Sequence, residues 1–383
     1  MTGLLGVILT GAVLLGAVVA IAPIAAAADT EQPPTRAASL SSEASGAVAS
    51  PDGDRVYVTA GGSLLALDST TLRQVSRTRT GGAPVAPTVS PRGTRVYVVD
   101  SENGRVVAIA TATGEVVWSV SLGGAPRAAT LDRTGALLYV TDPTRDLVAV
   151  VDTQRQSVVS RIPVGDSPLA TTLDPAHKRA YVANAGAGTI SVISLATRTV
   201  TQTLPVCAVP LRPVLAPSSS RLFVSCRESG VVAVIDTSRL ALARVIKVGR
   251  QPAPVTVVPG GQRLLVPLGG EDVVAVVDPA RGRVTKRIPV GPEPITAVLS
   301  PDGERALVPD TGGRTVSVIA VARMRAVSAW RTGRAPRYVL PLPAAVVVTE
   351  RGRVSVFDVR SSRLATREAA PPEQGGAVPR TGG

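Results

Sequence analysis

The sequence predicts an all-β fold, a single β-propeller built from four-stranded antiparallel blades. A strand-like unit recurs at a nearly constant step, its middle strands are apolar on both faces, and turn residues separate the strands at fixed positions. A period near 42 residues with strand-type sequence is typical of propellers, in which each repeat forms one blade.

The central residue of the unit establishes the period. It recurs at steps of 40, 42, 42, 42, 42 and 42 residues, at Tyr57, Tyr97, Tyr139, Tyr181, Phe223, Leu265 and Leu307. A weaker eighth copy centres on Val347. Counting the copies of each strand type predicts eight blades, with the last strand at residues 364–366, and seven blades is the alternative.

The middle strands of the units contain almost no polar residues. Residues 231–235 read Val-Val-Ala-Val-Ile, and residues 273–277 read Val-Val-Ala-Val-Val. A strand with one exposed face alternates apolar and polar residues, whereas a strand covered on both faces is apolar throughout. Stacked blades cover both faces of each sheet, so these runs favour a propeller over an isolated sandwich.

Turn residues punctuate each unit. Pro followed two residues later by Gly marks a β-turn at residues 50–53, 90–93 and 300–303. An Asp ends the apolar strand that follows the central one in several units, where its side chain can close the next turn: Asp68, Asp152, Asp236, Asp278 and Asp358. These signals give four strands per unit, which is one blade.

The same motifs resemble the YVTN-type β-propeller repeat. The matching segments are Tyr57-Val58-Thr59, Tyr139-Val140-Thr141 and Tyr181-Val182-Ala183-Asn184, with Ser-Pro-Asp-Gly before and Val-x-Val-Ile-Asp after. The resemblance covers about residues 45–367. It implies a seven- or eight-bladed propeller of a kind that is often exported or held at the cell surface, and it says nothing about chemistry.

The segments outside the propeller, which we assign to residues 45–367, differ in kind. Residues 29–44 are polar and aperiodic and are predicted to be a disordered linker, and residues 368–383 a disordered C-terminal tail. In residues 1–28, an uncharged apolar run is followed by Ala26 and Ala28, which predicts a signal peptide. Because this run is also long enough to span a bilayer, an N-terminal anchor is the alternative.

Either reading of residues 1–28 places the repeats outside the cytoplasmic membrane, in the extracellular space or the cell envelope. Membrane contact would then come only from residues 1–28, if they stay attached. The two cysteines, Cys207 and Cys226, flank the first hairpin of the fifth unit. An even number of cysteines in an exported protein favours a disulfide, and two free thiols are the alternative.

The chain is strongly basic, with a formal net charge of +13 that comes almost entirely from Arg. Such an excess favours anionic partners, although an Arg-rich composition that serves solubility would give the same charge. Only nine residues are aromatic, and five of them fall in strands predicted to be buried. With so few stacking platforms, sequence-specific nucleic-acid binding is not expected, and nonspecific binding is an alternative.

No residue set has a catalytic pattern. His177 is the single histidine and lies in a turn, so a Ser-His-Asp triad or a His-based metal site has no centre. We therefore expect no catalytic residue, no metal and no cofactor. The remaining candidates are side chains that directly follow the Tyr strand of four units: Asp100, Asp142, Asn184 and Asp310. They could cap turns or, with a divalent ion, serve a lactonase- or lyase-like enzyme.

Binding is the better-supported hypothesis. Side chains that vary between units at one end of the blades are not required by the fold, which makes them candidates for a partner site. The candidates are Arg127, Asp142, Asn184, Arg250, Asp310, Arg334 and Arg337. The sequence thus predicts a monomeric, exported, non-catalytic scaffold that docks an envelope protein or an anionic glycopolymer on this loop face.

Overall fold

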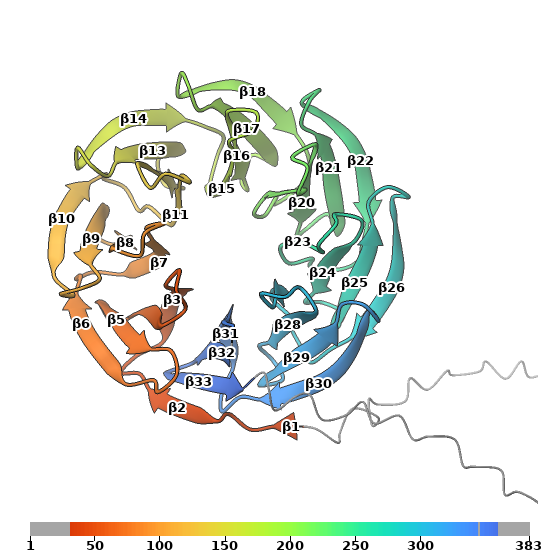
Figure 1. The fold of residues 1–383 in the computed structure, drawn as a ribbon. Coiled ribbons are helices and arrows are strands. Elements are labelled where there is room, and N and C mark those ends of the chain that lie inside the picture. The colour runs from red at the N-terminus through yellow and green to blue at the C-terminus, as the bar shows by residue number, and fades with distance from the viewer. Residues whose placement is uncertain (1–30, 344, 359–383) are drawn as a thin grey trace, which may run out of the picture.

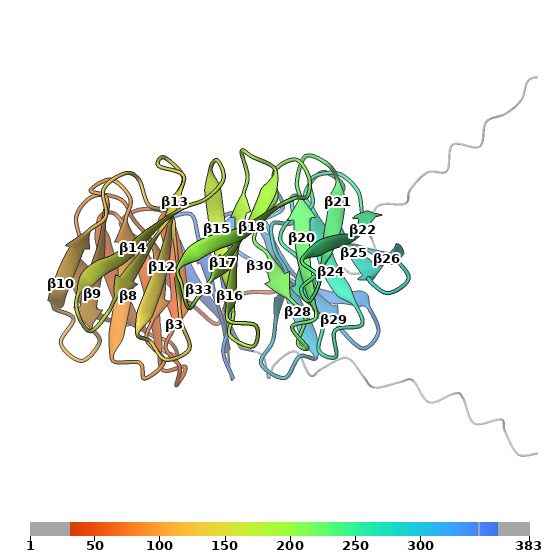
Figure 2. The same ribbon diagram turned by 90° about the horizontal axis from the view of Figure 1, so that it is seen from above.

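Residues 31–343 and 345–358 are described by the computed structural model. Their strands form eight sheets arranged as a ring around a central axis (Figure 1), which confirms the predicted eight-bladed β-propeller. Seen from the side, the ring is a disc with loops on both faces (Figure 2). These residues contain no helix, and hence none that is long and apolar enough to cross a membrane.

Each blade runs from an inner strand near the axis to an outer strand at the rim, and neighbouring strands within a blade are antiparallel. Blade 1 contains β3 (Ala44–Ala49), β4 (Arg55–Ala60), β5 (Ser63–Asp68) and β6 (Gln74–Arg79). Blade 2 contains β7 (Pro84–Val89), β8 (Arg95–Asp100), β9 (Arg105–Ala110) and β10 (Val116–Ser121). Blade 3 contains β11 (Ala128–Leu131), β12 (Leu137–Asp142), β13 (Leu147–Asp152) and β14 (Ser157–Pro163).

The next four blades repeat this plan with shorter inner strands in blades 5 to 7. Blade 4 contains β15 (Pro168–Asp174), β16 (Arg179–Asn184), β17 (Thr189–Ser194) and β18 (Thr199–Pro205). Blade 5 contains β19 (Val214–Leu215), β20 (Arg221–Cys226), β21 (Val231–Asp236) and β22 (Ala241–Lys247). Blade 6 contains β23 (Thr256–Val257), β24 (Leu264–Leu268), β25 (Val273–Asp278) and β26 (Arg283–Pro289). Blade 7 contains β27 (Val298–Leu299), β28 (Arg305–Asp310), β29 (Thr315–Ala320) and β30 (Arg325–Arg331).

The eighth blade is assembled from both ends of the described chain. It contains β31 (Pro336–Pro341), β32 (Ala345–Glu350) and β33 (Arg353–Asp358), and its outer strand is β2 (Arg36–Ser39). The short β1 (Glu31–Gln32) lies parallel to β30 on the rim of blade 7. At the axis, the Tyr338 hydroxyl of blade 8 donates a 2.9 Å hydrogen bond to the carbonyl of Ser45 in blade 1. The ring is thus closed at its rim and near its axis.

This closure differs from the sequence prediction in one place. Residues 29–44, expected to be a disordered linker, contain β1 and β2, and Arg36 pairs with Val356. This segment is polar and aperiodic, so the sequence did not indicate its strand β2, whose partner β33 is about 320 residues away. The last strand predicted at residues 364–366, the N-terminal segment 1–28 and the C-terminal tail 368–383 lie outside the described residues.

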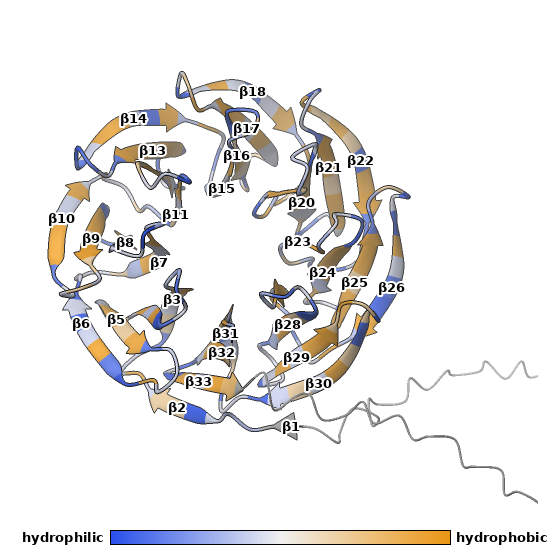
Figure 3. Ribbon diagram, viewed as in Figure 1, coloured by the Kyte–Doolittle hydropathy of each residue, from blue (hydrophilic) through white to orange (hydrophobic). Residues whose placement is uncertain are grey.

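Apolar packing joins each blade to its neighbours. The buried side chains form eight clusters, and each cluster combines residues of two adjacent blades. Figure 3 shows hydrophobic residues along the strands and hydrophilic residues mainly in the loops. In the cluster between blades 7 and 8, Trp330 stacks on Phe357 with ring centroids 5.2 Å apart. Apolar middle strands are therefore explained by cover on both faces, as the sequence indicates.

Deleting residues 1–40 should weaken the ring, because it removes β2 and exposes the edge of β33. The loss should be on the order of 4 kcal/mol, since four paired residues are involved and a net hydrogen bond contributes about 1 kcal/mol. Ala38 and Leu40 also leave the cluster between blades 8 and 1. Urea unfolding measures this change. Deleting only residues 1–30 is the control, and equal stability of the two shortened proteins would contradict the closure.

Candidate functional site

The loops that join successive blades share one face of the disc with the loops between the second and third strands of each blade. Backbone hydrogen bonds link the two loop types: the Ala185 amide donates to the Ser167 carbonyl at 2.9 Å, and the Arg227 amide to the Val209 carbonyl at 3.0 Å. We call this surface the joining face. The other loops form the opposite face. All the candidate binding residues predicted from the sequence belong to the joining face or to the strand ends beneath it.

One buried residue stands at the end of the second strand in every blade, directly beneath the joining loop. We call this the strand-end position. Its eight occupants are Ala60, Asp100, Asp142, Asn184, Cys226, Leu268, Asp310 and Glu350. None is more than 2% exposed. Asp142, Asn184 and Asp310 therefore lie under the loops rather than on the surface, each in its own blade, and the structure does not bring them together.

Asp100 and Asp142 bind the loops through their carboxylates. One oxygen of Asp142 accepts hydrogen bonds from the Ala125 amide at 3.3 Å and from the Thr144 hydroxyl at 2.7 Å. Asp100 pairs with Arg105, with Nε and the carboxylate oxygen 3.0 Å apart. The loop residue facing Asp142 has to be glycine, because a Cβ at Gly124 would approach the carboxylate to 2.0 Å. The carboxylates thus fix the loop backbone.

Asn184 and Asp310 make equivalent contacts in blades 4 and 7. The Asn184 amide nitrogen donates to Thr189 and Ser191, both at 2.9 Å. An Asp310 oxygen accepts from Thr315 at 2.9 Å and from Ser317 at 2.7 Å. Because burial disfavours the charged form, the pKa of Asp310 is raised to about 7, although the two hydroxyls act in the opposite direction.

Two glutamates hold the loops that carry the predicted Arg250 and Arg334. The Arg250 amide donates to Glu271 at 2.7 Å, and the Arg334 amide donates to Glu350 at 2.9 Å. In blade 6 the strand-end residue is Leu268, so Glu271 from the neighbouring loop supplies the acceptor. Neither glutamate contact was predicted from the sequence, although the repeat spacing aligns Glu350 with Asp310.

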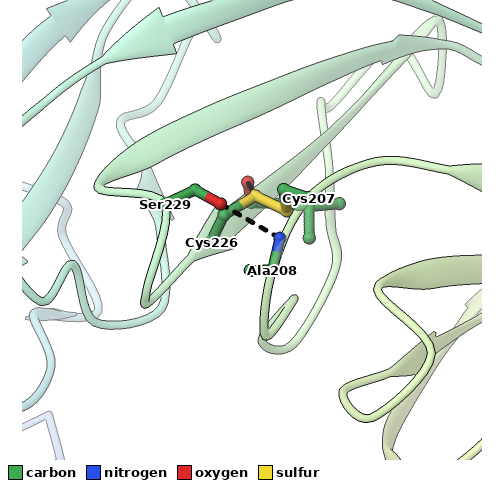
Figure 4. The surroundings of a disulfide bond; sticks show 5 residues. Cys207, Ala208, Cys226 and Ser229 are labelled. Atoms are coloured by element: carbon green, nitrogen blue, oxygen red, sulfur yellow. Dashed lines mark hydrogen bonds between the residues drawn. A yellow bond between two sulfur atoms is a disulfide. The ribbon is translucent and has the colours of Figure 1, made fainter.

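The fifth blade replaces this polar contact with a covalent bond. Cys226 occupies the strand-end position and forms a disulfide with Cys207 in the joining loop, with Cα atoms 5.9 Å apart (Figure 4). Cys207 stands where the other joining loops aligned at the 42-residue step have glycine. The Ala208 amide donates to the Ser229 hydroxyl at 3.0 Å. Closing a loop of this length stabilises the fold by about 3 kcal/mol.

The predicted arginines themselves are exposed at the joining face. The Arg250 guanidinium donates to the Gly270 carbonyl at 2.6 Å, and that of Arg334 to the Arg351 carbonyl at 3.2 Å. Arg337 pairs with Glu43 at 2.5 Å. Arg127 has no side-chain hydrogen bond or ion pair with any residue that the structure describes. These side chains come from blades 3, 6 and 8, so they surround the axis rather than forming one cluster.

A cleft of about 470 Å³ lies where the inner strands of blades 5 to 7 begin. Its apolar wall includes Leu211, Ala253 and Ile295, together with three prolines, and Arg227 and Glu293 flank it. Ile295 is 37% exposed. Reading each repeat separately did not predict this cleft, because its walls come from three different blades. Among residues 31–343 and 345–358, no group of three or more His, Cys, Asp or Glu side chains is placed to hold a metal ion.

Fold and site together define the chain as an eight-bladed β-propeller in which buried side chains secure the loops of one face. A family model described as "Outer membrane protein assembly factor BamB" matches residues 25–239, more than half of the sequence. The chain belongs to this family of PQQ-type propeller repeats. No curated protein matches it.

Two solved structures illustrate the shared architecture. Hydrazine synthase of Kuenenia stuttgartiensis is 21% identical and has a TM-score of 0.58, over 72% of this chain and 95% of that chain. The dihydro-heme d1 dehydrogenase NirN, solved in complex with DHE, is 18% identical with a TM-score of 0.69, over 87% of this chain and 74% of that chain. Likeness at these identities shows the fold alone.

Replacing Asp310 by Asn should make the protein more stable at high pH. Because the folded-state pKa of Asp310 is about 7 and an unfolded Asp titrates near 4, the group favours folding below pH 4 and loses this contribution as pH rises to 7. Asn184 makes equivalent contacts without a charge. The variant should therefore gain a few kcal/mol, at most about 4, at pH 8 and little at pH 4.

Urea unfolding at pH 4, 6 and 8 tests this. Asp236→Asn is the matched control, because hydrogen bonds from Ser238 and the Arg239 amide lower the pKa of Asp236 instead. That variant should show no gain as pH rises. An Asp310→Asn effect that is the same at all three pH values would contradict the raised pKa.

Proposed function

We propose that this chain is an exported, non-catalytic β-propeller that docks a protein partner of the cell envelope on its joining face. The observation that carries this proposal is that buried and exposed side chains have different roles at that face. Buried side chains at the strand ends hold the loops in place, while exposed side chains of both charge signs surround an apolar cleft.

The position of the carboxylates argues for binding rather than catalysis. A general acid, general base or ion ligand has to reach the substrate, yet Asp100, Asp142, Asp310 and Glu350 lie beneath the loops. Their hydrogen bonds go to loop amides, neighbouring hydroxyls and Arg105. The two solved structures are named as enzymes, but the likeness to them extends to the fold only.

The composition of the joining face favours a protein partner over an anionic polymer. Protein interfaces combine an apolar centre with a polar rim, and Arg is enriched in them. Here the apolar wall with Leu211 and Ile295 has Arg227 on one side and Glu293 on the other. A polyanion would be repelled by Glu293, whereas a protein surface can match both signs.

Family and sequence support the envelope location. The matching family is described as an outer membrane protein assembly factor, and the Tyr-Val-Thr motifs further suggest a YVTN-type member of this group. The apolar segment within residues 1–28 fits a secretion signal. Export also suits a disulfide between Cys207 and Cys226, because disulfides persist in oxidising compartments.

Sequencing the N-terminus of the protein produced in its own cells should find Asp29 first, because a signal peptidase cuts after a small residue such as Ala28. An N-terminus at residue 1 in the membrane fraction would establish the anchor instead. Recovery from the cytoplasm would contradict export in both forms.

Capture of the envelope partner should depend on the joining face. The triple variant Arg127→Glu, Arg250→Glu, Arg334→Glu should retain at least about tenfold less partner than the unaltered protein, because both charge pairing and steering are reversed. Ile295→Glu should weaken capture similarly by placing a charge in the apolar cleft. Quantitative mass spectrometry of proteins retained from the envelope fraction provides the measurement.

The control variants make the same kinds of substitution, aliphatic to Glu and Arg to Glu, away from the joining face. Leu242→Glu alters an aliphatic side chain on the outer strand β22 that is 41% exposed. Arg73→Glu, Arg92→Glu, Arg133→Glu reverses three exposed charges on the opposite face. Both controls should retain the partner. If joining-face variants and controls retain the same proteins, this face is not the docking surface.

A further inference from the structure

A second cleft, of about 890 Å³, opens on the opposite face and the rim of blades 5 to 7. The turns before β24 and after β25 in blade 6 form two of its walls, and residues 322–324 of blade 7 form a third. Buried Val276 and Met324 line its floor. The cleft is separate from the joining face and from every residue that the docking proposal uses.

Five basic side chains line this cleft against one acidic side chain. The basic residues are Arg221, Arg263, Arg281, Lys286 and Arg323, and the acidic residue is Asp278. Asp278 is already paired with Arg281 at 3.1 Å and accepts hydrogen bonds from the amides of Ala280 and Arg281. The other four basic side chains are exposed and form no ion pair with the described residues. The cleft thus carries an excess of four positive charges, five minus one.

The repeat does not require a cation at Lys286, whereas Arg221 and Arg263 occupy a position that is Arg in six blades. At the positions equivalent to Lys286, blade 4 has Gln202, which donates to the Leu240 carbonyl of the next blade at 3.2 Å. Blade 5 has Arg244, which lies against Gly282 of the next blade. For Lys286 of blade 6, the equivalent turn residue of the next blade is Met324, and Lys286 makes no hydrogen bond to it. Lys286 is therefore left facing the cleft.

The charge is also unevenly distributed over equivalent turns of the opposite face. In blades 1 to 3, residues 50–55, 68–73, 90–95, 110–115, 132–137 and 152–157 contain six acidic and six basic residues. In blades 5 to 7, the equivalent residues 216–221, 236–241, 258–263, 278–283, 300–305 and 320–325 contain four acidic and eight basic residues. The net charge of six equivalent turns is thus +4 in blades 5 to 7, eight minus four, and zero in blades 1 to 3.

We infer that this cleft binds a linear phosphodiester polymer, such as a sugar- or polyol-phosphate chain. Four of the five cations are Arg, whose planar guanidinium donates pairs of hydrogen bonds to phosphate oxygens. The cations extend from Arg221 in blade 5 to Arg323 in blade 7, which suits an extended chain better than a single small anion. No aromatic residue lines the cleft, so it has no platform on which nucleic-acid bases would stack.

Binding of short-chain inorganic polyphosphate, used as the probe, tests this inference by calorimetry at low and raised salt. The intact protein should bind the probe, with affinity that falls as salt screens the charges. The cleft variant Arg221→Glu, Arg263→Glu, Arg323→Glu should bind at least about tenfold more weakly. Arg73→Glu, Arg92→Glu, Arg133→Glu has the same change in net charge on the same face, and its affinity should change less than about threefold.

Several outcomes would overturn the inference. No binding by the intact protein at low salt would do so, as would equal losses in the cleft and control variants, which would indicate attraction to net charge alone. Polyglutamate binding as tightly as polyphosphate would exclude phosphate selectivity. A single-stranded oligonucleotide binding more tightly than polyphosphate would indicate that the cleft recognises nucleic acid instead. The joining-face variant Arg127→Glu, Arg250→Glu, Arg334→Glu should still bind polyphosphate, so that failure of one proposal is distinguishable from failure of the other. Unchanged thermal unfolding of each variant shows that it is folded.

Discussion

The rest of the structure depends on one constraint: both faces of every sheet are apolar and have to be buried against a neighbouring sheet. Each blade has apolar side chains on two faces, and only a closed ring gives every face a neighbour. The eight apolar clusters show this directly, because one lies at each junction between blades, including the junction of blades 8 and 1. The strand β2, near the N-terminal end of the described chain, pairs with β33 of blade 8 at this last junction. The ring is therefore closed by segments that are far apart in the sequence.

The strand-end position shows how one structural task accepts several chemical solutions. A carboxylate, an amide and a disulfide occupy it in different blades, at Asp142, Asn184 and Cys226. Where Leu268 occupies it, Glu271 from the adjacent loop binds the same loop backbone. Asp142 and Glu271 accept hydrogen bonds from loop amides, and Cys226 fixes the joining loop covalently, whereas Asn184 donates to hydroxyls of β17. Variation at this position therefore reflects local packing and is a weak indicator of ligand binding.

The fold was readable from the sequence because a constant period and apolar middle strands are local properties. The outer strand of blade 8 was not, since the pairing of Arg36 with Val356 leaves no local pattern. The sequence also placed Asp142, Asn184 and Asp310 at the correct end of the blades, but strand alternation does not reveal that loops cover that end. Neither cleft was predicted from the sequence, because the walls of each combine side chains from successive blades, such as Arg221, Arg281 and Arg323.

The two faces differ because the interior leaves their side chains free to vary. Exposed substitutions away from packed or hydrogen-bonded features change stability little, so equivalent turn positions can carry opposite charges in different blades without disturbing the ring. Stability alone would then leave the charges scattered. Instead, both signs surround the apolar cleft on the joining face, whereas five cations and one acidic residue line the cleft on the opposite face of blades 5 to 7. Mixed charge matches a protein surface and concentrated positive charge matches a polyanion, so a single disc can hold the two at once.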